Sequence, residues 1–246
     1  MKKLVILLSV ISITLLSFKA KEKITIYLIG DSTLSIKAVN KYPETGWGMP
    51  FAWFFNENVK VDNRAMNGRS TSSFIKENRW QPVVDSLQPG DYVLIQFGHN
   101  DEVTTKKTYT TPAQYVMYLT KYVQETQLKG ATPVLITPVA RRSFDDNGKV
   151  IDTHQQYAAL VRDLAKELNV PMIDLTEKSM MLLQELGEDK SELLYNHLKV
   201  GENPNYPKGK EDNTHFNELG ARKMAELVLC GIRELNLPLL AYIVDN

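Results

Sequence analysis

Short apolar runs alternate with longer amphipathic stretches along this chain. The short runs are rich in Val, Ile and aromatic residues, which is typical of buried strands. The predicted strands cover residues 23–29, 59–63, 91–97, 132–137 and 170–175. The predicted helices cover residues 47–55, 70–87 with a break at Pro82, 112–129, 150–169 and 176–186, and a last helix begins near Asn217.

This order of strands and helices indicates βαβ units and therefore a parallel sheet. We predict an α/β fold for residues 21–246, a three-layer α/β/α sandwich around a five-stranded parallel sheet. Polar turns follow the first four strands, at residues 30–33, 63–70, 98–101 and 137–142. We expect a functional site there, because open α/β sheets bind ligands at the carboxyl ends of their strands. Residues 187–213 predict a long loop.

The N-terminal segment is expected to lie outside that domain. Lys2 and Lys3 precede the apolar run 4–16, which is shorter than the ~20 residues of a membrane span but typical of a signal peptide. We predict a signal peptide at residues 1–20, and an exported protein, periplasmic or extracellular, with no membrane attachment after cleavage. An uncleaved membrane anchor is the alternative.

Composition excludes several other classes of protein. The chain has 29 basic and 29 acidic residues and no basic stripe, so nucleic acid is not an expected partner. The single cysteine, Cys230, rules out a disulfide framework and is expected to pack in the core. His154 and His197 lack the spacing of metal ligands, so we expect neither a metal nor a cofactor.

Two segments far apart in the sequence carry residues suited to nucleophilic chemistry. Ser32 follows Gly30 and Asp31 at the end of the first predicted strand, where a serine is either a nucleophile or a turn and helix-capping residue. Asp212 and His215 are three residues apart, which lets a carboxylate reach the imidazole in a helical turn or compact loop. An Asp that caps the following helix is the alternative interpretation.

Two of the intervening turns contain groups that could stabilise an oxyanion. Gly68 allows the backbone to approach a ligand and present its N–H, although an ordinary glycine turn is an equally good interpretation. Asn100 follows the third strand, where its side chain could donate to a developing negative charge or close an Asx-turn.

Together these segments resemble the SGNH (GDSL-like) hydrolase superfamily. The matching blocks, in chain order, are Gly30-Asp31-Ser32, Gly68, Gly98-His99-Asn100-Asp101 and Asp212-x-x-His215. The resemblance implies a flavodoxin-like SGNH fold, with Ser32 as nucleophile, His215 as base and Asp212 as its orienting acid. It also implies an oxyanion hole formed by the Ser32 N–H, the Gly68 N–H and the Asn100 side chain. Residues 30–34 are not a G-x-S-x-G elbow, which argues against an ordinary α/β-hydrolase.

Within this superfamily, the chain most resembles the rhamnogalacturonan acetylesterase branch, whose members remove acetyl groups from pectic backbones. The segments that carry it are 30–33, 63–74, 141–144 and 212–216. We therefore predict a serine acetylesterase acting on an acetylated polysaccharide or oligosaccharide.

Several side chains on the expected rim are candidates for contact with an acidic sugar. They are Arg69, His99 and Arg141, followed by Arg142 and Trp47, each of which could equally be a surface or packing residue. The alternatives for function are a broader carbohydrate acetylesterase, acting for example on xylan, and a lipase-like acyl hydrolase. The alternative outside enzymes is a carbohydrate-binding protein on a hydrolase fold.

Overall fold

A parallel sheet of five strands forms the centre of the computed structural model, which describes residues 23–244. The strands are β1 (Ile24–Gly30), β2 (Val59–Asn63), β3 (Tyr92–Gln96), β4 (Thr132–Ile136) and β5 (Met172–Ile173), and their order across the sheet is β2-β1-β3-β4-β5. The predicted signal peptide lies outside the described residues. Within them, no helix is both long enough and apolar enough to cross a membrane.

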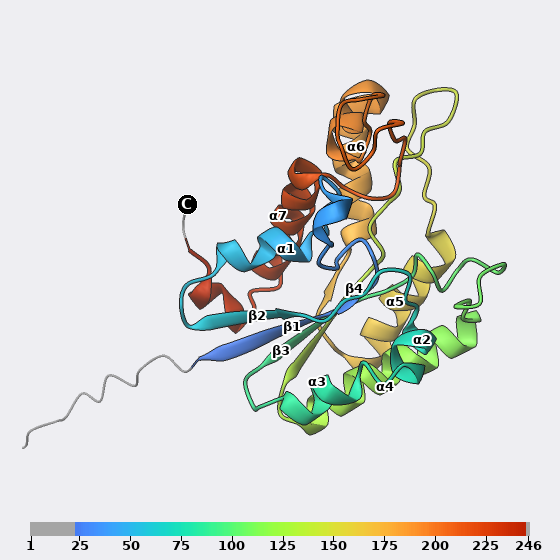
Figure 1. The fold of residues 1–246 in the computed structure, drawn as a ribbon. Coiled ribbons are helices and arrows are strands. Elements are labelled where there is room, and N and C mark those ends of the chain that lie inside the picture. The colour runs from blue at the N-terminus through green and yellow to red at the C-terminus, as the bar shows by residue number, and fades with distance from the viewer. Residues whose placement is uncertain (1–22, 245–246) are drawn as a thin grey trace, which may run out of the picture.

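Helices cover both faces of the sheet (Figure 1). One face carries α1 (Gly48–Phe51), α6 (Leu175–Ser191) and α7 (Glu218–Glu234), and the other carries α2 (Thr71–Lys76), α3 (Gln81–Ser86), α4 (Pro112–Leu128) and α5 (Gln155–Leu168). Short 3-10 turns lie at Val39–Lys41, Ala52–Phe54, Glu192–Leu194 and Pro238–Tyr242. The predicted three-layer α/β/α sandwich is confirmed.

The two faces of the sheet explain why the central strands β1, β3 and β4 are apolar at most positions, whereas the edge strand β2 (VKVDN) is not. In β1, Ile26 and Leu28 pack in the core beneath α1 and α7, whereas Tyr27 and Ile29 pack in the core beneath α2 to α4. Neighbouring positions of a strand point to opposite faces, so a sheet covered on both sides needs continuous apolar runs. The central strands therefore hold their carboxyl ends rigidly at one edge.

The predicted elements are present, with some changes at their ends. The helix predicted from residue 176 extends to Ser191, past Gly187, whose φ of 71° breaks the helical path. Cys230, expected in the core, is exposed, so that prediction was wrong. Val228, Leu229 and Ile232 form the buried face of α7, and Cys230 lies on the opposite side, where its thiol contacts Glu234 at 3.2 Å.

A buried carboxylate joins α2 to the loop that follows β3. Oδ1 of Asp101 accepts hydrogen bonds from the backbone N–H of Thr71 at 3.0 Å and from its hydroxyl at 2.6 Å. Asp101 has no exposed surface, and burial raises its pKa to about 7 despite these bonds. The contact fixes the loop that carries Asn100 relative to the turn that carries Gly68.

Because the pKa of Asp101 is raised, the stability of the folded protein should depend on pH, and Asp101→Asn should abolish this contribution. Above about pH 4 the unfolded chain carries the Asp101 charge while the folded chain stays protonated until about pH 7, so the folded state loses stability as pH rises between these values. Between about pH 5 and about pH 8, the free energy of unfolding of the wild type should fall by roughly 2–3 kcal/mol more than that of the variant.

Denaturant unfolding at the two pH values measures this difference. Asp146→Asn removes an exposed carboxylate from the 144–149 turn and serves as the matched control. If the difference in free energy of unfolding between the wild type and Asp101→Asn were the same at both pH values, the raised pKa of Asp101 would be contradicted.

Candidate active site

Ser32 lies in a tight turn at the carboxyl end of β1. The turn is closed by Asp31, whose carboxylate accepts from the Thr33 N–H at 3.0 Å and the Thr33 hydroxyl at 2.9 Å. Gly30 is required before it, because a Cβ there would lie 2.3 Å from the Gln96 carbonyl oxygen on β3. Gln96 in turn donates to the Thr33 hydroxyl at 2.8 Å, so the neighbouring strand holds the turn in place.

Gly68 and Asn100 lie on the two turns beside it. Gly68 has a φ of +77°, which favours glycine, and a Cβ there would meet no atom within 4 Å. The Asn100 amide donates to the Arg69 carbonyl at 3.1 Å, and its oxygen accepts from Lys106 at 2.9 Å. These bonds leave one N–H of the Asn100 amide free to donate. Within residues 23–244, the backbone N–H groups of Ser32 and Gly68 make no hydrogen bond.

Asp212 and His215 form a compact turn immediately before α7. Asp212 Oδ1 accepts the backbone N–H groups of Thr214 and His215, both at 2.9 Å, and its Oδ2 lies 2.9 Å from His215 Nδ1. The helix begins only after Asn217, whose side chain caps it at the Gly220 N–H. The sequence spacing of three therefore corresponds to a carboxylate-closed loop and not to a helical turn.

A hydrogen bond joins the turn after β1 to the loop before α7. His215 Nε2 lies 2.9 Å from Ser32 Oγ, across 183 positions of sequence. Since Nδ1 of the same ring faces Asp212, the three side chains form a continuous hydroxyl–imidazole–carboxylate series. Partial burial opposes ionisation of Asp212, but the hydrogen bonds and charge of His215 and the Thr214 N–H outweigh it and hold the pKa of this carboxyl well below its ordinary value. This geometry lets the imidazole take a proton from the hydroxyl while the carboxylate stabilises the imidazolium.

The loop that carries His215 is anchored by the turn after β4. Arg141 donates to the Thr214 hydroxyl at 2.7 Å and pairs with Glu102 at 3.3 Å. Arg142 donates its backbone N–H to the Asn213 carbonyl at 2.9 Å. These contacts place arginines beside the site, but their guanidinium groups already have protein partners.

The other residues considered for sugar contact occupy different positions. Arg69 pairs with Glu77 at 2.9 Å on the rim. His99 is only 3% exposed and packs against the His154 ring at a centroid distance of 4.3 Å. Burial lowers the pKa of His99 well below its ordinary value, so the ring is neutral at pH 7. Trp47 has no exposed surface and donates to Gln96 at 2.6 Å, which makes it a core residue.

One polar residue of the site was not anticipated from the sequence. Lys37 is buried, and its ammonium donates to the Ser32 carbonyl at 2.5 Å and to Asn67 Oδ1 at 2.9 Å. It pairs with Glu44 at 2.8 Å. No local pattern marks Lys37, because all but one of its partners lie seven or more positions away.

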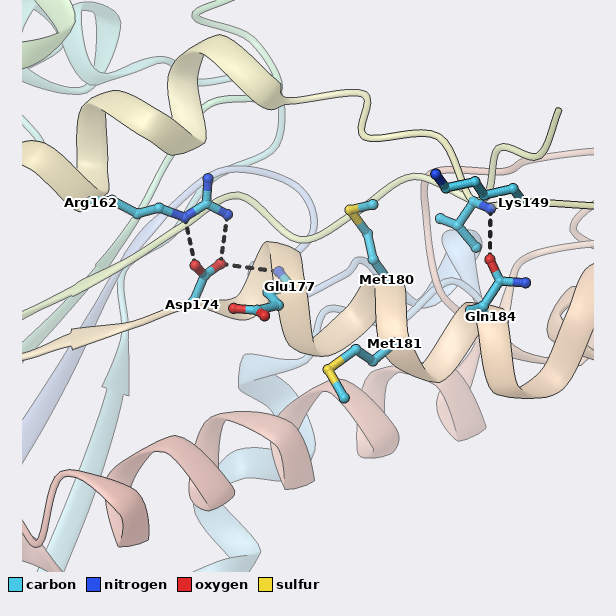
Figure 2. A pocket seen from close by; sticks show the side chains of 8 residues that line it. Lys149, Arg162, Asp174, Glu177, Met180, Met181 and Gln184 are labelled. Atoms are coloured by element: carbon cyan, nitrogen blue, oxygen red, sulfur yellow. Dashed lines mark hydrogen bonds and ion pairs between the residues drawn. The ribbon is translucent and has the colours of Figure 1, made fainter.

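A hollow on another part of the molecule does not include the proposed catalytic side chains. This hollow lies along α5 and α6 and has a volume of about 470 Å³. Arg162, Asp174, Met180 and Met181 line it, and two hydrogen bonds join Arg162 to Asp174 (Figure 2). Ser32 and His215 do not line it. In the described part of the chain, no three His, Cys, Asp or Glu side chains are grouped to hold a metal ion.

Comparisons with known proteins identify the relatives of this chain. Residues 28–223 match the model of the GDSL-like Lipase/Acylhydrolase family. The chain is 44% identical to the rhamnogalacturonan acetylesterase RhgT of Bacillus subtilis (strain 168), over 92% of this chain and 97% of that protein. It is 39% identical to the probable rhamnogalacturonan acetylesterase YesY of the same organism, over 90% of this chain and 98% of that protein.

A solved structure has a fold similar to that of this chain. The crystal structure of protein YXIM_BACsu from Bacillus subtilis has a TM-score of 0.76 at 25% identity, covering 88% of this chain and 58% of that one. The superfamily resemblance inferred from the four sequence blocks is thus confirmed, and the chain belongs to the GDSL-like lipase/acylhydrolase family.

Proposed function

We propose that this protein is a serine acetylesterase that removes acetyl groups from a pectic polysaccharide of the rhamnogalacturonan type. The observation that carries the chemistry is the series Ser32–His215–Asp212, with both hydrogen bonds at 2.9 Å, in a chain of this family. The substrate class rests on the 44% identity to a rhamnogalacturonan acetylesterase along nearly the whole of both chains.

The reaction begins with attack of Ser32 Oγ on the acetyl carbonyl carbon. His215 Nε2 takes the hydroxyl proton, and Asp212 holds Nδ1 so that Nε2 is free to accept it. The imidazolium then gives this proton to the sugar oxygen as the bond between that oxygen and the carbonyl carbon breaks, leaving an acetyl group on Ser32. A water molecule then attacks the acetyl carbonyl carbon while His215 takes one of its protons. The imidazolium returns this proton to Ser32 Oγ as the bond between Oγ and the acetyl carbon breaks, which releases acetate and restores the enzyme.

The negative charge that develops on the carbonyl oxygen needs donors that are already in position. The Ser32 N–H, the Gly68 N–H and the second N–H of the Asn100 amide are the donors we assign to it. Hydrogen bonds to Arg69 and Lys106 fix the Asn100 amide before substrate arrives, so little reorganisation is needed.

Acidic sugars are compatible with the charges on the rim. Arg69 and Arg141 are the proposed contacts for uronate carboxylates, because a guanidinium binds a carboxylate through two parallel hydrogen bonds. Both are already paired with Glu77 and Glu102, so a uronate has to share or replace these partners. His99 precedes Asn100 and is almost fully buried, so we assign it to the packing of that turn and not to sugar contact.

Asn100→Ala should reduce kcat far more than it raises KM, because the oxyanion contact forms mainly in the transition state. Loss of one such donor costs about 10²–10³ in rate. Steady-state kinetics with p-nitrophenyl acetate measure the effect, and Asn147→Ala in the exposed 144–149 turn is the control. A change confined to KM would make Asn100 a ground-state binding residue.

Substrate class is tested by acetate release from acetylated rhamnogalacturonan and from acetylated xylan, with Ser32→Ala as the inactive control. We expect rhamnogalacturonan to be the faster substrate, and its deacetylation to weaken with added salt because exposed charge contacts are screened. Acetate esters should also react much faster than octanoate esters.

Three results would contradict this proposal. Equal, salt-independent rates on xylan would favour a broad acetylesterase, and preference for octanoate would favour a lipase-like enzyme. Sugar binding without hydrolysis would favour a carbohydrate-binding protein.

We also propose export, on the basis of the basic and apolar pattern of residues 2–16. N-terminal sequencing of the protein recovered outside the cytoplasm should begin near Lys21. Recovery of the chain from a membrane fraction with Met1 still present would instead indicate an uncleaved anchor.

A further inference from the structure

Lys37 places a buried positive charge directly behind the reacting groups. Its side chain is only 2% exposed, and its ammonium donates to the Ser32 carbonyl at 2.5 Å. A buried ammonium is costly unless it is paired and hydrogen-bonded, so its retention there has to be offset by specific contacts. Glu44 supplies the opposite charge at 2.8 Å and is itself only 8% exposed.

A second hydrogen bond of the same ammonium reaches the neighbouring turn. Lys37 Nζ donates to Asn67 Oδ1 at 2.9 Å, and the Ser35 hydroxyl donates to the same oxygen. Asn67 immediately precedes Gly68, whose N–H we assign to the oxyanion hole. One amide oxygen therefore receives two donors from the segment that carries Ser32, and these bonds tie the Gly68 turn to the nucleophile turn.

A series of ion pairs connects Lys37 to Asp212. The Glu44 carboxylate lies 3.6 Å from Lys210, and Lys210 lies 3.1 Å from Asp212 Oδ2. Positive and negative groups thus alternate from the Ser32 carbonyl to Asp212. The Lys37–Glu44 pair is the most deeply buried link of this series.

We propose that Lys37 is a positioning residue that sets the separation between the Ser32 hydroxyl and the Gly68 N–H by holding Asn67. This inference rests on the proposed ester hydrolysis. Transition-state stabilisation depends on donors fixed in place before reaction, and a displacement of about 1 Å can cost about 10² in rate. Lys37 touches no reacting atom, and its effect is transmitted through the Ser32 carbonyl and the Asn67 side chain.

The test compares Lys37→Met with Lys41→Met, an exposed lysine four positions further along the same segment. Methionine keeps the apolar stem and removes the ammonium. We expect kcat for p-nitrophenyl acetate to fall about tenfold to hundredfold in Lys37→Met, with KM changing less than about threefold and Lys41→Met unchanged. Far-ultraviolet circular dichroism and thermal unfolding establish that each variant is folded.

A second measurement uses a probe whose adduct with Ser32 resembles the tetrahedral intermediate of ester hydrolysis. A fluorophosphonate phosphonylates Ser32: Oγ bonds to phosphorus, fluoride leaves and His215 takes the hydroxyl proton. The P=O oxygen of the adduct occupies the position of the oxyanion. Intact-mass measurement of the labelling rate should show the same loss in Lys37→Met as kcat shows. Failure of the acetylesterase proposal would appear separately, as wild-type protein that labels normally but releases no acetate.

Two further variants separate positioning from charge pairing. Glu44→Gln in the Lys37→Met background removes the carboxylate that has lost its buried lysine partner, and the labelling rate should stay low if the lysine acts through Asn67. Asn67→Ala should lower the rate by a similar factor. In the double variant with Lys37→Met the loss should be smaller than the product of the two single losses, because both substitutions remove the same hydrogen bond between Lys37 and Asn67.

Full recovery in the Lys37→Met/Glu44→Gln variant would overturn the proposal and leave Lys37 as a counter-ion only. Additive losses from Lys37→Met and Asn67→Ala would also overturn it, since the two side chains would then act independently. A folded Lys37→Met protein with wild-type kcat and labelling rate would show that the contact has no positioning role.

Discussion

The hydrogen bond between Ser32 Oγ and His215 Nε2 is the contact on which the rest of the site depends. It joins residues separated by 183 positions, so both must be carried to the same place by well-fixed supports. Ser32 is held by the carboxyl end of β1, and His215 is held by the Asp212 turn and by contacts from the β4 turn. The parallel sheet makes this possible because its strand ends converge at one edge (Figure 1).

The electrostatics of the site show how one residue type serves different purposes. Asp31 and Asp101 are fully buried, and burial raises the pKa of each carboxyl. Asp31 closes its own turn by accepting from Thr33, and Asp101 joins two segments by accepting from Thr71. Asp212 is partly exposed and faces an imidazole, and its pKa is lowered, so it carries a charge throughout the neutral range. Partner and burial, rather than residue type, decide which carboxylate can stabilise an imidazolium.

The order of strands and helices could be predicted because both faces of the sheet are covered, which gives its strands continuous apolar runs. Ser32, Gly68, Asn100, Asp212 and His215 were singled out because their blocks occur in the order of the SGNH hydrolase superfamily; each polar segment taken alone also fitted an ordinary turn or a helix cap.

Other features depend on contacts between distant segments and left no local signal. The burial of Lys37 depends on Glu44 and Asn67, and the packing of Trp47 depends on Gln96. Cys230 was misplaced because it lies within an apolar stretch of α7 but faces away from the core. The residues that hold the site together were therefore harder to recognise than those assigned to its chemistry.

The central claim is that Ser32 carries the acetyl group between the sugar and water. Rapid acid quenching during turnover of an acetyl ester, followed by peptide mass mapping, tests it directly. The account predicts a single acetyl group on the peptide that contains Ser32, formed within the first turnover and lost when the ester is exhausted. Hydrolysis at full rate with no acetyl group on that peptide, or with the acetyl group on another residue, would contradict it.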